Sequence, residues 1–292
     1  MDLRAIGMGL IFALMWSSAF ATARIIVADA APLAVLALRF LISGFIAIAA
    51  AMALGAARLP ARDQWRSILI FGLLQNAAYL GLNFVAMQWV EASLAVIIAA
   101  SMPLMVAALS WALRGEGLPP LGLAGLIAGF AGTALIMGTR LSTGADPLGT
   151  VLCILGALGL AIATLTLRSA SGAQGGFGPL LMVVGLQMLA GSVALGVIAA
   201  LFEPFRLTPT LPLALAFAYQ IAIPGLAATL LWFALVRRIG PTRAATFHFL
   251  NPAFGTAIAA VLLNETLRLT DILGAAVVAA GILAVQLSRK SA

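Results

Sequence analysis

The sequence predicts an all-α integral membrane protein with ten transmembrane helices, arranged as two inverted five-helix repeats. Three observations lead to this fold class. Hydrophobic residues make up 63% of the 292-residue chain and charged residues only 9%, whereas soluble domains carry about 25% charged residues. Ten apolar stretches are long enough to cross a bilayer, and the second half of the chain repeats spacings of the first.

A helix needs about 20 apolar residues to cross the hydrocarbon core of a bilayer. The first repeat, residues 5–139, contains predicted spans at 5–26, 33–54, 67–88, 92–113 and 119–139. The second repeat, residues 147–287, contains predicted spans at 147–168, 178–201, 212–235, 242–263 and 270–287. The short connectors leave no room for an aqueous ATPase domain, and the chain has no Gly-x-x-x-x-Gly-Lys-Ser/Thr phosphate loop.

Two proline-to-glutamate segments reveal the duplication. Pro103 is followed thirteen residues later by Glu116, and Pro252 is followed thirteen residues later by Glu265. The two segments lie 149 residues apart, and glycines of the fifth and tenth spans match at the same offset. Because each half holds an odd number of spans, the second half must lie inverted in the membrane. Inverted repeats are typical of secondary transporters, which bind substrate near the midplane where the repeats meet.

The distribution of basic residues predicts the orientation. Lys and Arg are enriched in cytoplasmic loops. With a cytoplasmic N-terminus, that side of the membrane carries eleven basic residues: Arg4, Arg58, Arg62, Arg66, Arg114, Arg168, Arg237, Arg238, Arg243, Arg289 and Lys290. The opposite side carries Arg140, Arg206 and Arg268, with Arg24 near the end of the first span, together with most of the acidic residues. Both termini are therefore expected in the cytoplasm.

The paired prolines lie near the middle of the fourth and ninth spans. Proline removes a helical hydrogen bond and clashes with the preceding turn, so each helix should kink at Pro103 and at Pro252. One explanation is a kink that is tolerated in a packed helix. The other is a gating hinge or cavity wall, which the occurrence at both repeat positions favours, and the sequence leaves both explanations open. Glu116 and Glu265 end the same spans, and we expect them to act as turn and cap residues rather than as substrate ligands.

Polar side chains at membrane depth are costly and often functional. In the third span, Tyr79 and Asn83 continue a polar stripe that includes Gln75 and Asn76, because residues three or four apart share a helix face. Hydrogen bonding between helices explains such a stripe as well as substrate binding does. An aromatic ring and an amide suit a zwitterionic solute with an apolar tail, so Tyr79 and Asn83 are candidate cavity residues.

The first and eighth spans each contribute a candidate tryptophan. Trp16 falls at mid-depth beside Ser17, whereas membrane tryptophans usually lie at the headgroup level. A buried indole needs a partner for its N–H group, and either core packing or a cavity wall satisfies this requirement. Trp232 aligns with Asn83 across the repeat and is a candidate for an inner gate.

The ninth span contains His248, the single histidine of the chain, and Asn251. Histidine titrates near neutral pH, so His248 is a candidate for proton relay or for binding a substrate carboxylate. The alternative is a neutral imidazole that is hydrogen-bonded within the bundle. Arg39 in the second span can extend its side chain to water or meet an anionic group in the cavity.

The predicted spans lack the residue types that some transport and catalytic mechanisms require. They contain no Asp or Glu at mid-depth, so a carboxylate proton relay is not expected. One histidine and one cysteine on different helices cannot assemble a four-ligand zinc site. We therefore expect no metal, no cofactor and no catalytic residues, and the choice between proton-coupled and facilitated transport stays open.

Several short motifs resemble a known family. They are Trp16 to Phe20 in the first span, Pro32 with Arg39 in the second, Asn83 in the third, and the two proline-to-glutamate segments. Together with the ten spans and the duplication, they resemble the EamA-type members of the drug/metabolite transporter superfamily, and among these the bacterial exporters of aromatic amino acids and related metabolites. The resemblance implies a ten-helix transporter whose cavity is built by helices one to four and six to nine.

The expected function is therefore secondary transport by alternating access around a midplane cavity. Aromatic or neutral amino acids are the expected substrates, with lipophilic cations as a further class, because few charges lie at depth. A membrane-embedded enzyme and a passive channel are the alternatives, but converging acid, base or metal groups and a charged or carbonyl-rich filter are both missing from the sequence. The expected setting is the bacterial inner membrane, with lipid and a small molecule as partners, no nucleic acid, and a monomer as a plausible working unit.

Overall fold

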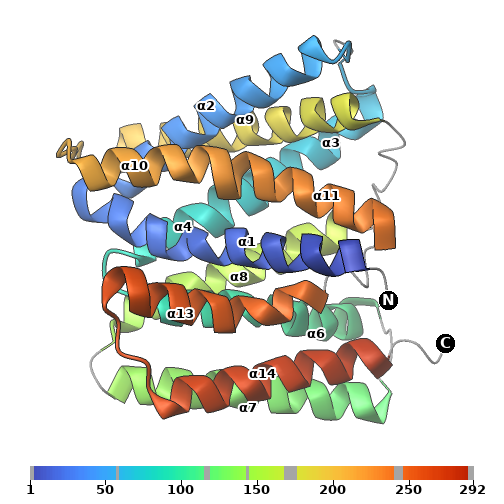
Figure 1. Ribbon diagram of the computed structural model, residues 1–292, viewed down its shortest axis with the longest axis vertical. Helices are drawn as coiled ribbons and strands as arrows, with labels where there is room; N and C mark the ends of the chain where they lie inside the picture. Colours follow the sequence, from blue (N-terminus) through green and yellow to red (C-terminus); the bar gives the residue numbers. More distant parts are fainter. Residues whose placement is uncertain are drawn as a thin grey trace.

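The computed structural model describes residues 3–56, 59–114, 119–142, 145–167, 176–239 and 246–288. These residues are helical except for short connections, and the strand-like pairing among them is a single isolated bridge between Ala30 and Leu207. The helices lie roughly side by side in an elongated bundle (Figure 1). This arrangement confirms the all-α fold class.

The first half of the chain begins with two uninterrupted helices, α1 (Leu3–Asp29) and α2 (Pro32–Ala53). The next membrane-length helix has three consecutive parts: α3 (Arg62–Phe71), the π-helical η1 (Gly72–Tyr79) and α4 (Leu80–Ala86). The half is completed by α5 (Ala92–Ala100), α6 (Met102–Arg114) and α7 (Pro120–Ser142).

The second half repeats this order. It begins with α8 (Pro147–Leu167) and α9 (Phe177–Phe202). Its third helix again has three parts: α10 (Leu211–Gln220), the π-helical η2 (Ile221–Ala227) and α11 (Ala228–Ile239). The 3₁₀ segment η3 (Thr246–Leu250), α13 (Asn251–Leu263) and α14 (Leu269–Ser288) follow.

The helices match the ten predicted spans. Five helical stretches of 22 to 27 residues are long and apolar enough to cross a membrane, namely α1, α2, α3 to α4, α9, and Leu211–Trp232. Five shorter apolar helices occupy the remaining predicted positions, among them Pro120–Ile136, Pro147–Ala163 and Asn251–Leu263. Within the described residues the chain is thus a bundle of ten apolar helical segments.

Two pairs of repeat-related helices pack against each other in antiparallel directions. A β-carbon added at Gly281 of α14 would lie 2.5 Å from the carbonyl oxygen of Gly125 in α7, and one at Gly274 would lie 3.1 Å from that of Gly132. As the numbers fall along α14 they rise along α7, so the two helices run in opposite directions, as Figure 1 also shows. These are the fifth helices of the two halves.

The second helices of the halves are paired in the same way. A β-carbon at Gly44 of α2 would lie 3.0 Å from the carbonyl oxygen of Gly185 in α9. Ser192 of α9 donates a 2.7 Å hydrogen bond to the carbonyl oxygen of Ala37, on the side of Gly44 nearer the start of α2. Antiparallel pairing of both sets of repeat counterparts is the geometry expected of inverted repeats. The beginning of α1 and the end of α14 lie at the same end of the bundle (Figure 1), as an even number of spans requires.

Both proline segments interrupt their helices, as the sequence predicted. The fourth helix is broken between α5 and α6 at Ser101, with Pro103 in the first turn of α6. The ninth helix changes from the 3₁₀ segment η3 to α13, where Pro252 lies in the first turn. Proline is tolerated in a first turn because its missing N–H would have no helical partner there. Each break therefore begins a new helix at a proline.

The two π-helical segments were not anticipated from the sequence, which predicted regular third and eighth helices. Gly72 begins η1 and Ile221 begins η2, and these positions lie 149 residues apart, which is the repeat offset. A π-helix widens the turn and is often found at functional sites. Pro224 lies inside η2 and explains its departure from α-helical hydrogen bonding, whereas η1 contains no proline.

Candidate transport cavity

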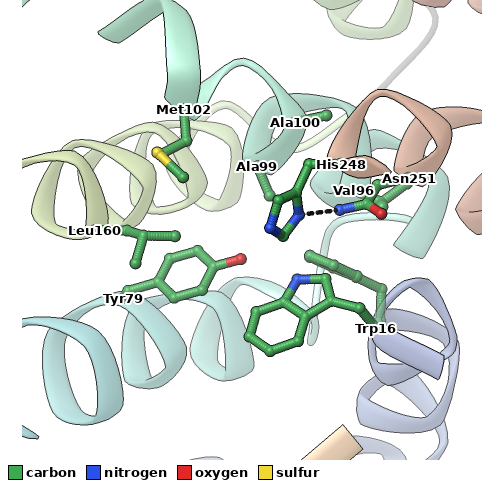
Figure 2. Close-up of a pocket in the computed structure, with 10 residues that line it drawn as sticks. Trp16, Tyr79, Val96, Ala99, Ala100, Met102, Leu160, His248 and Asn251 are labelled. Atoms are coloured by element: carbon green, nitrogen blue, oxygen red, sulfur yellow. Dashed lines mark hydrogen bonds between the residues drawn. The ribbon is translucent and has the colours of Figure 1, made fainter. Parts of the chain in front are cut away.

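A cavity of about 30 Å³ lies between the two halves of the bundle (Figure 2). The first half contributes residues of α1, η1, α5 and α6, and the second half contributes residues of α8, η3 and α13. The ten lining residues are Trp16, Phe20, Tyr79, Val96, Ala99, Ala100, Met102, Leu160, His248 and Asn251. Four of them, Trp16, Tyr79, His248 and Asn251, are candidates from the sequence.

His248 and Asn251 are one turn apart at the junction of η3 and α13. The side-chain amide nitrogen of Asn251 lies 2.9 Å from Nδ1 of His248, and Figure 2 shows this contact at the cavity wall. Since an amide NH₂ group only donates, Nδ1 accepts and the ring proton is assigned to Nε2. The pair thus holds a neutral imidazole with a defined orientation toward the cavity.

Ser17 connects this pair to the first helix. Its Oγ lies 3.4 Å from both the backbone carbonyl oxygen and the Oδ1 of Asn251, and the Ser17 side chain is fully buried. Ser17 therefore supports Asn251 from behind and does not line the cavity itself. This contact joins the first helix of one half to the ninth helix of the other.

Three aromatic rings, those of Phe12, Trp16 and Trp232, contact His248. Trp16 meets the imidazole edge-on at a centroid distance of 6.1 Å. Trp232 of α11 lies 4.9 Å from His248 and 4.9 Å from the buried ring of Phe12. Trp232 thus packs against His248 at a tilted angle of 60° and does not line the cavity. It belongs to the same apolar cluster as Phe247 of η3, whose ring fills the space above Gly9.

Tyr79 is the last residue of η1, and its side chain is almost completely buried. Figure 2 shows its hydroxyl pointing toward Trp16 and His248 across the cavity. Asn83 lies one turn further along and does not line the cavity; its amide donates a 2.8 Å hydrogen bond to the carbonyl oxygen of Tyr79. Its buried Oδ1 has no hydrogen-bond partner in the described part of the chain. Asn83 thus stabilises the backbone of Tyr79 at the end of the π-helix.

The polar stripe of the third helix was explained by hydrogen bonding between helices or by substrate binding. The amide of Asn76 donates a 3.0 Å hydrogen bond to the carbonyl oxygen of Gln187 in α9, which is the interhelical role. Gln75 does not line the cavity. Within the stripe, Asn76 therefore faces α9 and Tyr79 faces the cavity.

Arg39 lies away from the cavity. On α1, Trp16 and Phe20 line the cavity, whereas Ser18 and Thr22 face the eighth helix, where they meet Tyr219 and Gln220. Residues two apart on a helix point about 200° apart. Arg39 lies with the eighth helix, because its Nη2 is 3.6 Å from the position that a β-carbon of Gly225 would take. Arg39 and the cavity are therefore on opposite sides of α1.

Glutamates stabilise helix beginnings at one end of the bundle. The carboxylate of Glu265 accepts hydrogen bonds of 2.7 and 3.0 Å from the backbone N–H groups of Ala92 and Ser93 at the start of α5. Glu203 accepts in the same way from Leu33 and Ala34 at the start of α2, at 2.9 and 2.8 Å. A carboxylate at a helix N-terminus satisfies free N–H groups and the helix dipole. Glu265 is thus a cap, as expected, but of a helix in the other half; Glu116 lies outside the described residues.

The sequence did not distinguish six of the lining residues. Phe20, Val96, Ala99, Ala100, Met102 and Leu160 have the same chemical character as the apolar residues that face lipid. The break beside Pro103 is the one signal that could have drawn attention to Met102 and to the end of α5. No group of three or more His, Cys, Asp or Glu residues that could hold a metal occurs among the described residues.

Inverted helical repeats with a cavity between them define a membrane transporter. The chain belongs to the EamA-like transporter family, whose pattern matches residues 3–138 and again residues 147–287. The family pattern thus matches each half of the chain once. The predicted repeats were residues 5–139 and 147–287. The family consists of transporters and not of enzymes, in agreement with the expectation from the sequence.

Relatives in three organisms resemble nearly the whole chain. The uncharacterized inner membrane transporter YedA of Escherichia coli is 29% identical over 96% of this chain and 90% of its own length. The uncharacterized transporter YvbV of Bacillus subtilis is 24% identical over 95% of this chain and 90% of its own length. A WAT1-related chloroplastic protein of Arabidopsis thaliana is 25% identical over 90% of this chain and 64% of its own length. The inner-membrane location of YedA agrees with that expected for this chain, which has multiple membrane-spanning helices.

A solved structure shares the fold. It is a crystal structure that superposes with a TM-score of 0.69 over 99% of both chains at 24% identity. At this identity the similarity bears on the fold alone.

Proposed function

We propose that this transporter exports small amphipathic metabolites, above all neutral and aromatic amino acids, by alternating access around the cavity. The observation that carries the proposal is the lining itself: an indole, a phenol, an imidazole and an amide face one another across an otherwise apolar cavity. None of the ten lining residues is Asp, Glu, Lys or Arg. A zwitterion with an aromatic side chain complements this set, because rings stack on Trp16 and Tyr79 while Asn251 and His248 hydrogen-bond.

The cavity is too small for the proposed substrates, which implies that the two halves move during transport. A water molecule needs about 10–15 Å³ of accessible volume, so about 30 Å³ has room for two or three waters at most and not for an amino acid. Ligand pockets are usually about 300–1,000 Å³. A substrate must therefore bind to a conformation of the protein in which the two halves have separated. Pro103 and Pro252 are the proposed hinges of this movement.

Close packing on both sides of the cavity indicates where the separation would occur. At one side, Gly255 of α13 packs against Val96 of α5, and a β-carbon at Gly255 would lie 2.6 Å from Val96. At the other side, Phe247 of η3 packs over Gly9 of α1. In both places the ninth helix meets the first half through a glycine. Opening either contact alone would expose the cavity to one side of the membrane.

His248 is the candidate for coupling to protons. In its neutral form the ring accepts from Asn251, and protonation of Nδ1 would break that hydrogen bond and reorient the pair. If protons are not coupled, the gradient of the substrate drives facilitated export. A monomer in the inner membrane is the proposed working unit, since both repeats lie in one chain.

Transport by the purified protein in proteoliposomes tests the function. We expect saturable transport of radiolabelled phenylalanine, tryptophan or neutral aliphatic amino acids, with competition among them. Absence of transport for every amino acid in the panel would refute the amino acid assignment. Insensitivity to an imposed pH gradient would remove His248 from the coupling role without affecting the rest of the proposal.

Lipophilic cations are a second candidate class, favoured by the same aromatic rings. Cations bind to the faces of Trp and Tyr with about 0.5–2 kcal/mol, and none of the ten described lining residues is Lys or Arg, which would repel them. Uptake of tetraphenylphosphonium into the same vesicles distinguishes the two classes. Transport of this cation with no transport of amino acids would assign the protein to cation export.

A further inference from the structure

A second polar site lies on the side of α1 that faces away from the cavity. Arg39 is 95% buried, and its buried Nε has no hydrogen-bond partner among the described residues. The guanidinium lies over the ring of Phe40, whose centroid is 5.1 Å from Cζ. A buried charge without a counter-charge is strongly destabilising. The position therefore calls for a negatively charged partner.

The surroundings of Arg39 supply a second free polar group. Ser43 lies one turn further along α2, is fully buried, and its Oγ has no hydrogen-bond partner among the described residues. The β-carbon position of Gly225 is 3.5 Å from Ser43 Oγ and 3.6 Å from Arg39 Nη2. Both side chains therefore converge on the same glycine, and they belong to the first half whereas Gly225 belongs to the second.

The π-helical η2 brings its backbone close to both side chains. A β-carbon at Gly225 would lie 2.7 Å from the carbonyl oxygen of Gln220, so the turn admits only glycine without a shift. Gln220 fixes the turn to the first helix, because its amide nitrogen donates to the carbonyl oxygen of Ala19 at 2.7 Å and to Thr22 Oγ1 at 2.9 Å. The surroundings of Arg39 are thus formed by helices of both halves.

We propose that Arg39, Ser43 and the glycine turn of η2 form a binding site for a small monovalent anion. A guanidinium has donors and no acceptor, and a serine hydroxyl can donate, so the complementary ligand is an acceptor with a negative charge. With a glycine as the third wall, the ligand is a single compact group, either a halide ion or a carboxylate. The bound anion neutralises Arg39 and bridges α2 to η2, which stabilises this arrangement of the two halves.

Anion-dependent thermal stability of the detergent-solubilised protein tests the site. Chloride is titrated against gluconate at constant ionic strength, and acetate is titrated in the same way to distinguish a carboxylate source. We expect a saturable rise in Tm with chloride or acetate, abolished in Arg39→Gln and shifted to at least about tenfold higher anion concentration in Ser43→Ala. Arg66→Gln on the exposed face of α3 is the matched control and keeps the wild-type response.

The outcomes separate cleanly. A response to chloride alone assigns the site to a halide, and a response to acetate alone assigns it to a carboxylate; both support the anion site. The same Tm in every anion, or an equal response in Arg39→Gln, overturns it. If Arg39→Gln does not fold, Arg39→Lys and Ser43→Ala carry the test, since each should weaken the response while the protein stays folded. The measurement reports anion binding and does not require transport. Its result therefore tests the anion site independently of the proposed function.

Discussion

Two outer helix pairs, α2 with α9 and α7 with α14, flank a central group of interrupted helices (Figure 1). The outer pairs and the interrupted helices use small residues and prolines in contrasting ways. The outer pairs are continuous helices whose glycines allow backbone contact. Between them, the third, fourth, eighth and ninth helices are broken by π-turns, by a 3₁₀ segment or at a proline. In lipid, close backbone contact is what holds helices together, whereas a broken helix frees polar groups that must face protein or water. The outer pairs are suited to be a scaffold, and the interrupted helices to move.

The strongest disruption of the scaffold is expected from Gly281→Leu in α14. The new side chain would collide with the backbone of α7, since its β-carbon alone would lie 2.5 Å from the carbonyl oxygen of Gly125 and 2.8 Å from the amide nitrogen of Gly129. Overpacking costs about 1–3 kcal/mol, and we expect a loss at or above the upper end, measured as a fall in Tm. Ala280→Leu, at an exposed neighbouring position, should leave Tm nearly unchanged. Equal stability of both variants would contradict a rigid α7–α14 contact.

A smaller effect is expected from Glu265→Gln, which tests an attachment between the halves. The substitution removes the charge that accepts from Ala92 and Ser93 at the start of α5. Charge-assisted hydrogen bonds contribute about 1.5–3 kcal/mol, and the neutral amide retains part of this. We expect a loss of about 1–2 kcal/mol in stability and faster thiol labelling of an Ala92→Cys reporter.

The neighbouring Thr266→Ala, at an exposed position, provides the control for Glu265→Gln. It should change neither the stability nor the labelling rate. Unaltered labelling in Glu265→Gln would show that the cap does not restrain the start of α5.

Removing the aromatic wall of the cavity should affect transport more than stability. Trp16→Ala deletes a ring that lines the cavity and contacts His248. Aromatic contacts contribute about 0.5–1.5 kcal/mol beyond their buried area, so we expect about a tenfold loss of kcat/KM in proteoliposomes. Trp111→Ala, whose side chain is 50% exposed on α6, is the control and should transport normally. Normal transport by folded Trp16→Ala would return this residue to a purely structural role.

The smallest effect is expected from Trp232→Leu, which probes the packing behind His248. The ring contacts His248 and Phe12 but does not line the cavity. We expect a loss of about 0.5–1 kcal/mol in stability, with a KM for substrate within about twofold of wild type. A large rise in KM with unchanged stability would instead place Trp232 among the substrate contacts.

The sequence predicted the breaks of the fourth and ninth helices because proline disrupts a helix at its own position, whatever packs around it. The same reasoning failed for η1 and η2. Gly72 and Ile221 begin them, but neither residue type demands a π-turn, and η1 contains no proline. Such turns depend on what packs beside them, such as the bond from Gln220 to Ala19.

The site was predicted in part for a similar reason. Polarity at membrane depth pointed to Trp16, Tyr79, His248 and Asn251, which the structure brings together. It pointed equally to Arg39 and Asn83, which are elsewhere, because polarity does not tell which side of a helix faces the cavity. The apolar lining residues carried no signal, since Leu160 and Met102 differ from lipid-facing residues only in position.

By itself, the sequence determined the membrane class, the number of spans, the duplication and the inversion, because hydrophobic length, repeat spacing and an odd span count are properties of the chain alone. The tertiary structure decided which polar side chains meet. It placed His248 among Trp16, Tyr79 and Asn251, and Arg39 beside Ser43 and Gly225 behind α1. The physical reason is that contacts between helices depend on rotation and depth to within a fraction of a turn, and close packing of the whole bundle sets both.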